Sequence, residues 1–135
     1  MKKVNRHAKD TVLVFEGGGM RASYTSAMAS LLMEQGITFD YVCGISAGAS
    51  NTVNFLSGDV QRTRNSFVDL VMEPEFGGLS SFLHGKGMFS AEWIYEETGL
   101  PGGVLPFDFE AFQNNPTPCA IQAFDRDTGE TVVWH

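Results

Sequence analysis

A chain of 135 residues with 43% hydrophobic content is long enough for one domain with its own core and too short for two. Its formal net charge is −7, with an isoelectric point near 4.8, so its electrostatic field repels phosphate backbones and we expect no nucleic-acid partner. No apolar run approaches the ~20 residues that a membrane-spanning helix requires.

The first half of the chain alternates predicted strands and helices. Residues 11–16 form a short apolar run, rich in β-branched side chains, that predicts a buried parallel strand. From Tyr24 onward, apolar residues recur at helical spacing until Gly36, which is well placed to end a helix. Residues 39–43 predict a second strand, and residues 49–56 predict a second helix of small residues. This order predicts that the two strands pair in parallel through a right-handed crossover.

The second half of the chain is less regular. Residues 60–72 predict a third helix, while Ser90 and Asp108 are candidate N-caps of two short helices. Residues 118–124 and 130–134 alternate or run apolar around a polar turn that contains glycine. These two segments predict a β-hairpin.

Two cysteines, Cys43 and Cys119, lie inside apolar, strand-like stretches. Their spacing matches neither a disulfide-rich scaffold nor a zinc site, so we expect no bound metal. We expect both residues to be buried free thiols. Free thiols suit a reducing compartment, and we therefore predict a cytoplasmic protein.

The first sharp motif is Gly44-Ile45-Ser46-Ala47-Gly48, which lies between the second predicted strand and the second predicted helix. This is the context of the G-x-S-x-G nucleophile elbow, a tight turn that lifts a serine above the edge of a sheet. Gly44 and Gly48 are needed because the turn brings backbone close to backbone. The turn also places the Ser46 hydroxyl at the positive end of the following helix. Ser46 is therefore the predicted nucleophile.

A second glycine motif, Gly17-Gly18-Gly19, follows the first predicted strand and precedes the first predicted helix. Consecutive backbone N–H groups in such a loop can converge on an anion. In acyl transfer, that anion is the oxyanion of the tetrahedral intermediate. Arg21, at the start of the helix, either adds positive potential near the site or forms a salt bridge that braces the loop.

The glycine loop also fits part of a dinucleotide-binding fingerprint. Gly17, Gly19 and Ala22 satisfy the pattern G-x-G-x-x-G/A after a strand. That fold needs an acidic residue at the end of the second strand to hold the ribose hydroxyls. Asp40 lies at the start of that strand instead, and the end of the strand runs into Ser46. The position of Asp40 argues against nucleotide binding.

An ordinary α/β-hydrolase is a second alternative, because it also combines a nucleophile elbow with an upstream oxyanion loop. That fold places several strands before the serine and a histidine base after it. Here a single strand–helix unit precedes Ser46. The histidines are His7, His84 and His135. None has a recognisable aspartate partner in the sequence order that the catalytic triad of this fold requires.

Taken together, the two glycine motifs resemble those of the patatin-like phospholipase family, and most closely those of its bacterial members. The motifs are Gly17-Gly18-Gly19-Met20-Arg21-Ala22 and Gly44-Ile45-Ser46-Ala47-Gly48. The resemblance implies a three-layer α/β fold with a mostly parallel central sheet between helices. It also implies a Ser–Asp dyad in which the aspartate accepts the serine proton directly, without a metal or another cofactor. Lipid acyl esters are the implied substrates, reached by peripheral contact with a membrane.

Two features depart from the family pattern. Ala22 stands where the family usually has glycine, a change of one methyl group that we expect the helix start to tolerate. The catalytic aspartate of the family lies far downstream in an Asp-Gly-Gly or Asp-Gly-Ala motif, and these 135 residues contain no Asp-Gly dipeptide. Asp125 and Asp127 lie in the predicted hairpin turn, where we expect them to form the turn rather than to act as a base.

We therefore expect residues 1–10 to form an N-terminal tail and residues 11–135 to form the N-terminal part of a single patatin-like catalytic domain, incomplete at its C-terminus. The predicted activity is that of a serine acyl-ester hydrolase of the phospholipase A type, with Ser46 as nucleophile and an aspartate beyond this chain as base. The predicted oxyanion hole consists of Gly17, Gly18, Gly19 and Arg21. On this reading the 135 residues alone are inactive. The alternative is an inactive lipid- or protein-binding module.

Overall fold

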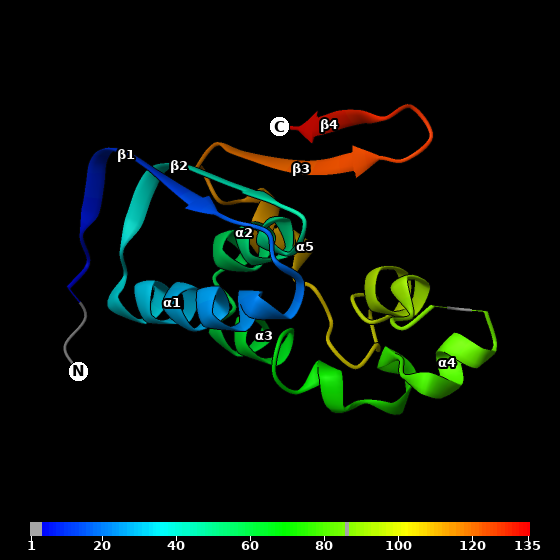
Figure 1. Ribbon diagram of the computed structural model, residues 1–135. Coiled ribbons are helices and arrows are strands. Elements are labelled where there is room, and N and C mark those ends of the chain that lie inside the picture. Colours follow the sequence, from blue (N-terminus) through cyan, green and yellow to red (C-terminus); the bar gives the residue numbers. More distant parts are fainter. Residues whose placement is uncertain (1–3, 86) are drawn as a thin grey trace.

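A four-stranded sheet with helices against one face organises the chain (Figure 1). The computed structural model describes residues 4–85 and 87–135. The strands, in order across the sheet, are β1 (His7–Phe15), β2 (Thr38–Ile45), β3 (Cys119–Asp125) and β4 (Glu130–Trp134). The first three pair in parallel, and β4 pairs antiparallel with β3. The expected α/β class, the parallel pairing and the C-terminal hairpin are confirmed.

Helices and single helical turns make up most of the remaining structure. In chain order they are η1 (Gly19–Arg21), α1 (Ala22–Gln35), α2 (Ala47–Ser57), α3 (Val60–Asn65), η2 (Leu70–Met72), η3 (Pro74–Phe76), α4 (Leu79–Leu83), the π-helical turn η4 (Trp93–Glu97) and α5 (Phe109–Gln113). As predicted, α1 ends at Gly36, which is left-handed with φ 67°. Asp108 caps α5 by accepting a hydrogen bond from the Ala111 N–H at 2.8 Å.

The core lies between the sheet and the first two helices. Its buried side chains are Phe15, Ala29, Val42, Phe55 and Leu56. Phe15, the last residue of β1, meets Phe55 of α2 edge to face, with ring centroids 5.9 Å apart. This contact ties the carboxyl end of β1 to α2.

The opposite face of the sheet carries exposed apolar side chains. Val12 and Val14 are 54% and 64% exposed, and the parallel register places Tyr41 and Cys43 beside them. Figure 1 shows the described helices on the other side of the sheet. Residues 4–85 and 87–135 therefore form two of the three layers that the family resemblance implies.

The first strand begins earlier than its sequence pattern suggests. We expected a strand from residue 11, but β1 starts at His7 and passes through an irregularity between Ala8 and Val12. Asp10 there has φ 53°, which interrupts the alternation of side chains along the strand. Residues 7–10 of the expected tail are therefore strand, while residues 1–3 lie outside the described residues.

The predicted helix over residues 60–72 is wrong in its length. It ends at Asn65, and only the single turn Leu70–Met72 is helical again. Beyond Asn65 the chain continues in turns that keep single backbone bonds, from the Val68 N–H to the Arg64 carbonyl at 3.1 Å and from the Asp69 N–H to the Asn65 carbonyl at 3.2 Å.

Arg62 joins three segments of the chain at the side of the core. Its Nε donates to Oδ1 of the buried Asn54 at 3.0 Å, and its Nη1 donates to the carbonyls of Leu105 and Pro106. The guanidinium carbon also lies 5.1 Å from the centre of the Phe107 ring. Burial lowers the pKa of Arg62 from its ordinary value. Arg62 therefore holds the loop before α5 against α2 and α3.

Replacing Arg62 should destabilise the domain. We expect Arg62→Met to lower the free energy of unfolding by about 2–4 kcal/mol, because the buried Asn54 oxygen loses its donor and two backbone carbonyls lose theirs. The matched control is Arg64→Met, since Arg64 is exposed in the same helix and should change the stability by about 0.5 kcal/mol or less. Urea unfolding of both variants measures the difference, and equal losses would contradict this role.

Candidate active site

Ser46 occupies a strained turn between β2 and α2. Its backbone has φ 56° and ψ −126°, a conformation that costs free energy for any residue except glycine. The Ser46 N–H donates to the Gln122 carbonyl of β3 at 3.3 Å, and its own carbonyl accepts from the Ala49 N–H at 2.9 Å. The residue itself is exposed. The expected sharp turn at Ser46 is therefore present, at the carboxyl end of a parallel strand and the first turn of a helix.

The two glycines of this turn lie where no side chain fits. A Cβ atom on Gly48 would overlap the Phe15 carbonyl oxygen and lie 2.8 Å from the Glu16 carbonyl oxygen. A Cβ on Gly44 would overlap the Gly48 carbonyl and lie 2.5 Å from the Thr52 hydroxyl oxygen. The Thr52 hydroxyl itself donates a hydrogen bond to the Gly48 carbonyl at 3.0 Å. Both glycines are needed because α2 lies directly against the ends of β1 and β2.

The glycine loop after β1 lies beside Ser46. A Cβ on Gly17 would come within 3.2 Å of the Ser46 Cβ and 3.1 Å of the Ile45 carbonyl oxygen. Gly18 and Gly19 follow with φ 149° and 55°, both in the region that favours glycine. The structure therefore brings together the two motifs that lie 27 residues apart in the sequence, counted from Gly17 to Gly44.

Arg21 folds back over this loop. Its Nε and Nη2 atoms would lie 3.3 and 3.5 Å from a Cβ on Gly18. Its N–H donates to the Gly18 carbonyl at 3.2 Å, which closes the turn η1. Among the described residues Arg21 forms no ion pair, so the bracing salt bridge that the sequence left open is not seen. The guanidinium instead adds positive potential beside the glycine loop.

Asn51 is a buried polar residue that joins the two helices behind the candidate site. Its side chain is fully buried, and its Nδ2 donates to the Ala22 carbonyl at 3.3 Å. Since Ala22 begins α1 and Asn51 lies in α2, this bond joins the helices that follow the two motifs. Its signal in the sequence was a polar residue five positions after Ser46 in a helix of small residues. Its Oδ1 atom has no hydrogen-bond partner among the described residues.

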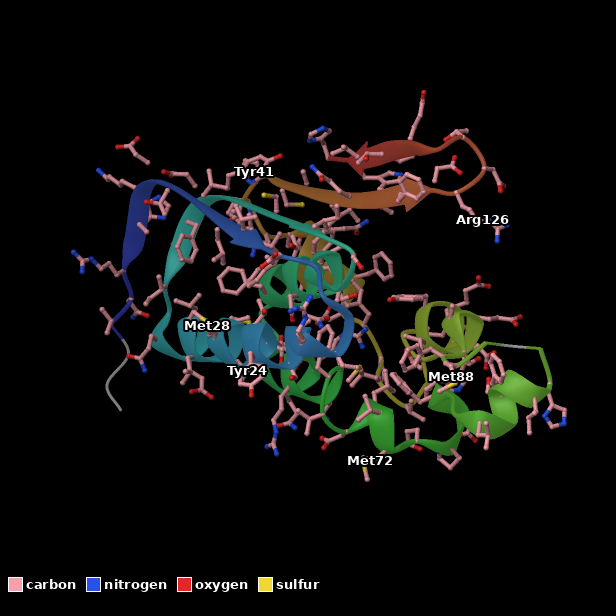
Figure 2. The ribbon with its side chains drawn as sticks, viewed as in Figure 1. Tyr24, Met28, Tyr41, Met72, Met88 and Arg126 are labelled. Atoms are coloured by element: carbon pink, nitrogen blue, oxygen red, sulfur yellow. The ribbon has the colours of Figure 1, made fainter. Side chains whose placement is uncertain are left out.

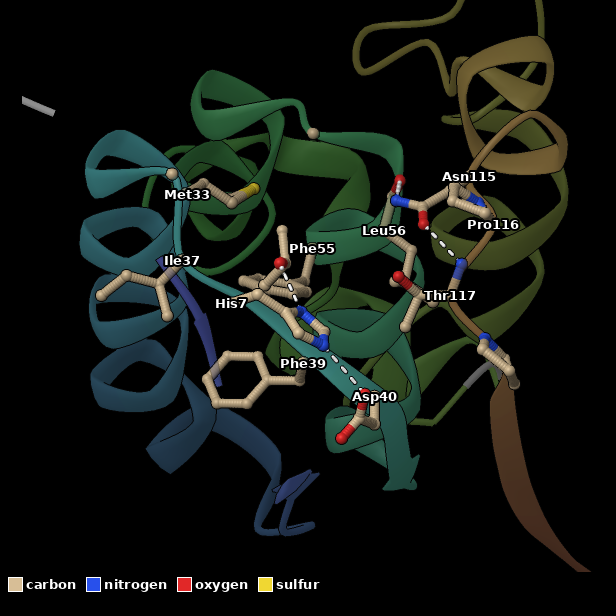
Figure 3. Close-up of a pocket in the computed structure, with 14 residues that line it drawn as sticks. His7, Met33, Ile37, Phe39, Asp40, Phe55, Leu56, Asn115, Pro116 and Thr117 are labelled. Atoms are coloured by element: carbon tan, nitrogen blue, oxygen red, sulfur yellow. Dashed lines mark hydrogen bonds and ion pairs between the residues drawn. The ribbon is translucent and has the colours of Figure 1, made fainter. Parts of the chain in front are cut away.

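A cavity of about 540 Å³ lies at the other end of the sheet (Figure 3). On its wall, His7 Nε2 lies 2.9 Å from Asp40 Oδ1, and His7 Nδ1 lies 3.0 Å from the Thr38 hydroxyl oxygen. The hydrogen bond from His7 holds the pKa of Asp40 below its ordinary value. Because His7 and Thr38 begin β1 and β2 whereas Ser46 follows the end of β2, this cavity is not part of the Ser46 site.

The geometry argues against the two alternative kinds of site, a dinucleotide-binding site and the histidine-containing triad of an ordinary α/β-hydrolase. Asp40 is the third residue of β2 and contacts His7, so it does not lie where a dinucleotide-binding fold needs its acidic residue. His135 lies with Nδ1 3.5 Å from the Tyr41 hydroxyl, also in the first half of β2. Neither His7 nor His135 is therefore placed to act as a base for Ser46.

Cys43 and Cys119 are free thiols, but both are half-buried rather than fully buried; burial raises the pKa of Cys119. Within the described ranges, no three His, Cys, Asp or Glu side chains gather as a metal site would require. No helix in that part of the chain combines the length and the apolar character needed to cross a membrane.

A strained serine between strand and helix, packed against a glycine loop, is the arrangement that defines hydrolases with a nucleophile elbow. The family model of patatin-like phospholipases matches residues 13–132, which include both motifs. The chain therefore belongs to the patatin-like phospholipase family, as the two motifs predicted. No curated protein and no solved structure gave a significant match.

The close packing at Gly48 predicts a large steric effect. Gly48→Ala should lower the free energy of unfolding by about 3 kcal/mol, because the new methyl group overlaps the Phe15 carbonyl. The control is Gly58→Ala at the other end of α2, where φ is 71° but no atom lies within 4 Å. There only backbone strain opposes the substitution, and we expect a loss of about 1 kcal/mol. Urea unfolding compares the two variants, and equal losses would show that packing at Gly48 is not decisive.

Proposed function

We propose that this protein is a serine hydrolase of lipid acyl esters, of the phospholipase A type, in which Ser46 is the nucleophile. The observation that carries the proposal is the contact between the Ser46 turn and the Gly17 loop at the carboxyl ends of β1 and β2. Membership of the patatin-like phospholipase family supplies the substrate class. The nucleophile elbow provides the reacting group, which is the Ser46 hydroxyl.

In the proposed reaction, the Ser46 Oγ attacks the carbonyl carbon of the acyl ester and a new C–O bond forms. The carbonyl oxygen becomes an oxyanion, which we place against the N–H groups of Gly17, Gly18 and Gly19. The amino terminus of the 11-residue helix α2 adds positive potential at the same point. The tetrahedral intermediate then expels the alcohol, and water releases the fatty acid from the acyl-enzyme and restores the serine.

The proton of Ser46 needs an acceptor, and we place this base, an aspartate, outside these 135 residues. Asp125 is engaged in the hairpin turn, where its Oδ1 accepts from the N–H groups of Asp127 and Thr128 at 2.8 and 3.4 Å. These bonds hold the pKa of Asp125 below its ordinary value. The turn-forming role expected for Asp125 is confirmed. We therefore expect little hydrolysis from the 135 residues alone, and the alternative for the full protein is an inactive binding module.

Labelling of Ser46 tests the proposed nucleophile. In the full-length protein, a fluorophosphonate probe should label Ser46, and Ser46→Ala should lower the hydrolysis of p-nitrophenyl butyrate on the order of 10³-fold or more. The matched control is Ser50→Ala in the first turns of the same helix, which should keep both labelling and turnover. Labelling that persists in Ser46→Ala would move the nucleophile elsewhere. An absence of labelling in the unchanged protein would favour the binding module.

Substitution in the glycine loop tests the proposed oxyanion hole. Gly18→Ala should lower kcat at least about tenfold and change KM little, because a displaced loop affects donors that act mainly in the transition state. Gly102→Ala is the control, since Gly102 also has a positive φ, 85°, with no atom within 4 Å of the new methyl group. Steady-state kinetics on a soluble ester separate the two parameters. A change confined to KM would assign the loop to substrate packing.

A further inference from the structure

A loop on the side of the domain exposes apolar side chains that the proposed chemistry does not use. We call residues 77–85 and 87–89 the apolar loop; it contains α4. Its exposed large apolar side chains are Leu79 (70%), Phe82 (56%), Leu83 (74%), Met88 (53%) and Phe89 (55%), and His84 is exposed as well. Figure 2 shows Met88 in this projecting part of the molecule, apart from the sheet. A concentration of exposed apolar groups on one projection marks an interaction surface.

The base of the apolar loop is a defined structure. Gly77 and Phe89 form an antiparallel bridge, and the Gly78 N–H donates to the Met88 carbonyl at 2.9 Å. The ring of Phe89 packs edge-on against that of Phe76, with centroids 5.4 Å apart. A Cβ on Gly77 would lie 2.9 Å from the Phe89 Cα, so glycine permits this close approach. The loop is therefore held at its base while its apolar side chains face outward.

The charge of the apolar loop differs from that of the whole chain. The chain carries 16 acidic residues and a net charge of −7, yet the stretch between Glu75 and Glu92 contains no Asp or Glu and one lysine, Lys86. Apolar side chains without carboxylates can enter a lipid interface, and a lysine among them can keep its ammonium group at the headgroup level. The acidic body is repelled by anionic headgroups. This combination matches a lipid surface without net charge.

The position of the apolar loop matches the position of the nucleophile. In Figure 1, β1 and β3 point toward the side of the molecule that carries α4. Ser46 lies at that same end of the sheet, because it follows the carboxyl end of β2. We propose that the apolar loop inserts into a zwitterionic phospholipid surface and so holds the Ser46 end of the sheet toward the membrane. This inference rests on the proposed function for its substrate, but insertion itself can be measured without catalysis.

Vesicle binding by charge variants tests this surface. The full-length protein should co-sediment with phosphatidylcholine vesicles, and raising the salt concentration should not release it, because the contact is apolar. Leu83→Asp should lower the vesicle partition coefficient at least about tenfold, and Leu79→Asp should repeat the effect at an independent position. Hydrolysis of phosphatidylcholine in vesicles should fall in parallel. Turnover of soluble p-nitrophenyl butyrate should stay unchanged.

The matched control is Met72→Asp, which adds the same charge at a methionine that is 81% exposed but lies before the apolar loop. It should bind vesicles as the unchanged protein does. Equal binding by Leu83→Asp and the unchanged protein, or an equal loss in Met72→Asp, would overturn the inference. The inference would also be overturned if the full-length protein did not bind vesicles but formed a dimer, and if Leu83→Asp dissociated that dimer in analytical ultracentrifugation. Vesicle binding that is sensitive to Leu83→Asp, without hydrolysis of either ester, would support the inference and refute the proposed function.

Discussion

The close approach of α2 to the carboxyl ends of the first two strands is the constraint on which the site depends. Gly48 in the first turn of α2 lies against the carbonyls of Phe15 and Glu16, at a distance that excludes even a methyl group. Glu16 is followed directly by Gly17, so the contact that seats the helix also fixes the start of the glycine loop. One packing contact therefore positions both halves of the candidate site.

Two further interactions maintain this approach from the core side. The ring of Phe15 packs against Phe55 near the far end of α2, and burying a ring of this size contributes about 2–3 kcal/mol. Asn51, between these two contacts, bonds to the first residue of α1. The helix is thus held at its beginning by backbone contact, in its middle by a buried amide and near its end by an aromatic pair. The strained backbone of Ser46 persists because these contacts fix the chain on its helical side.

Interactions between residues close together in the sequence made much of this structure predictable. Gly36 ends a helix, Asp108 caps one and Asp125 organises a turn, because each acts on neighbours within a few residues. The elbow was predictable because its glycines and serine have fixed spacing. Non-local contacts were not predictable. Nothing near Arg62 in the sequence indicates its role, because its partners Leu105 and Pro106 lie more than 40 positions away. The early start of β1 was hidden by the irregularity at Asp10, which disrupts the alternation that marks a strand.

Neighbouring residues of the nucleophile elbow are subject to two different constraints, one from packing and one from the proposed chemistry. Gly44 and Gly48 are fixed by steric exclusion, whereas the exposed Ser46 side chain contributes little to the packing around it. A lineage that loses its chemistry can therefore replace the serine while folding still selects for both glycines. Among relatives of this chain, retained glycines then indicate only a conserved architecture, and under the proposed function the residue between them determines whether the protein is an enzyme. Under the same proposal, a well-folded relative without the serine would bind lipid without cleaving it and could be used to capture the substrate from a cell extract.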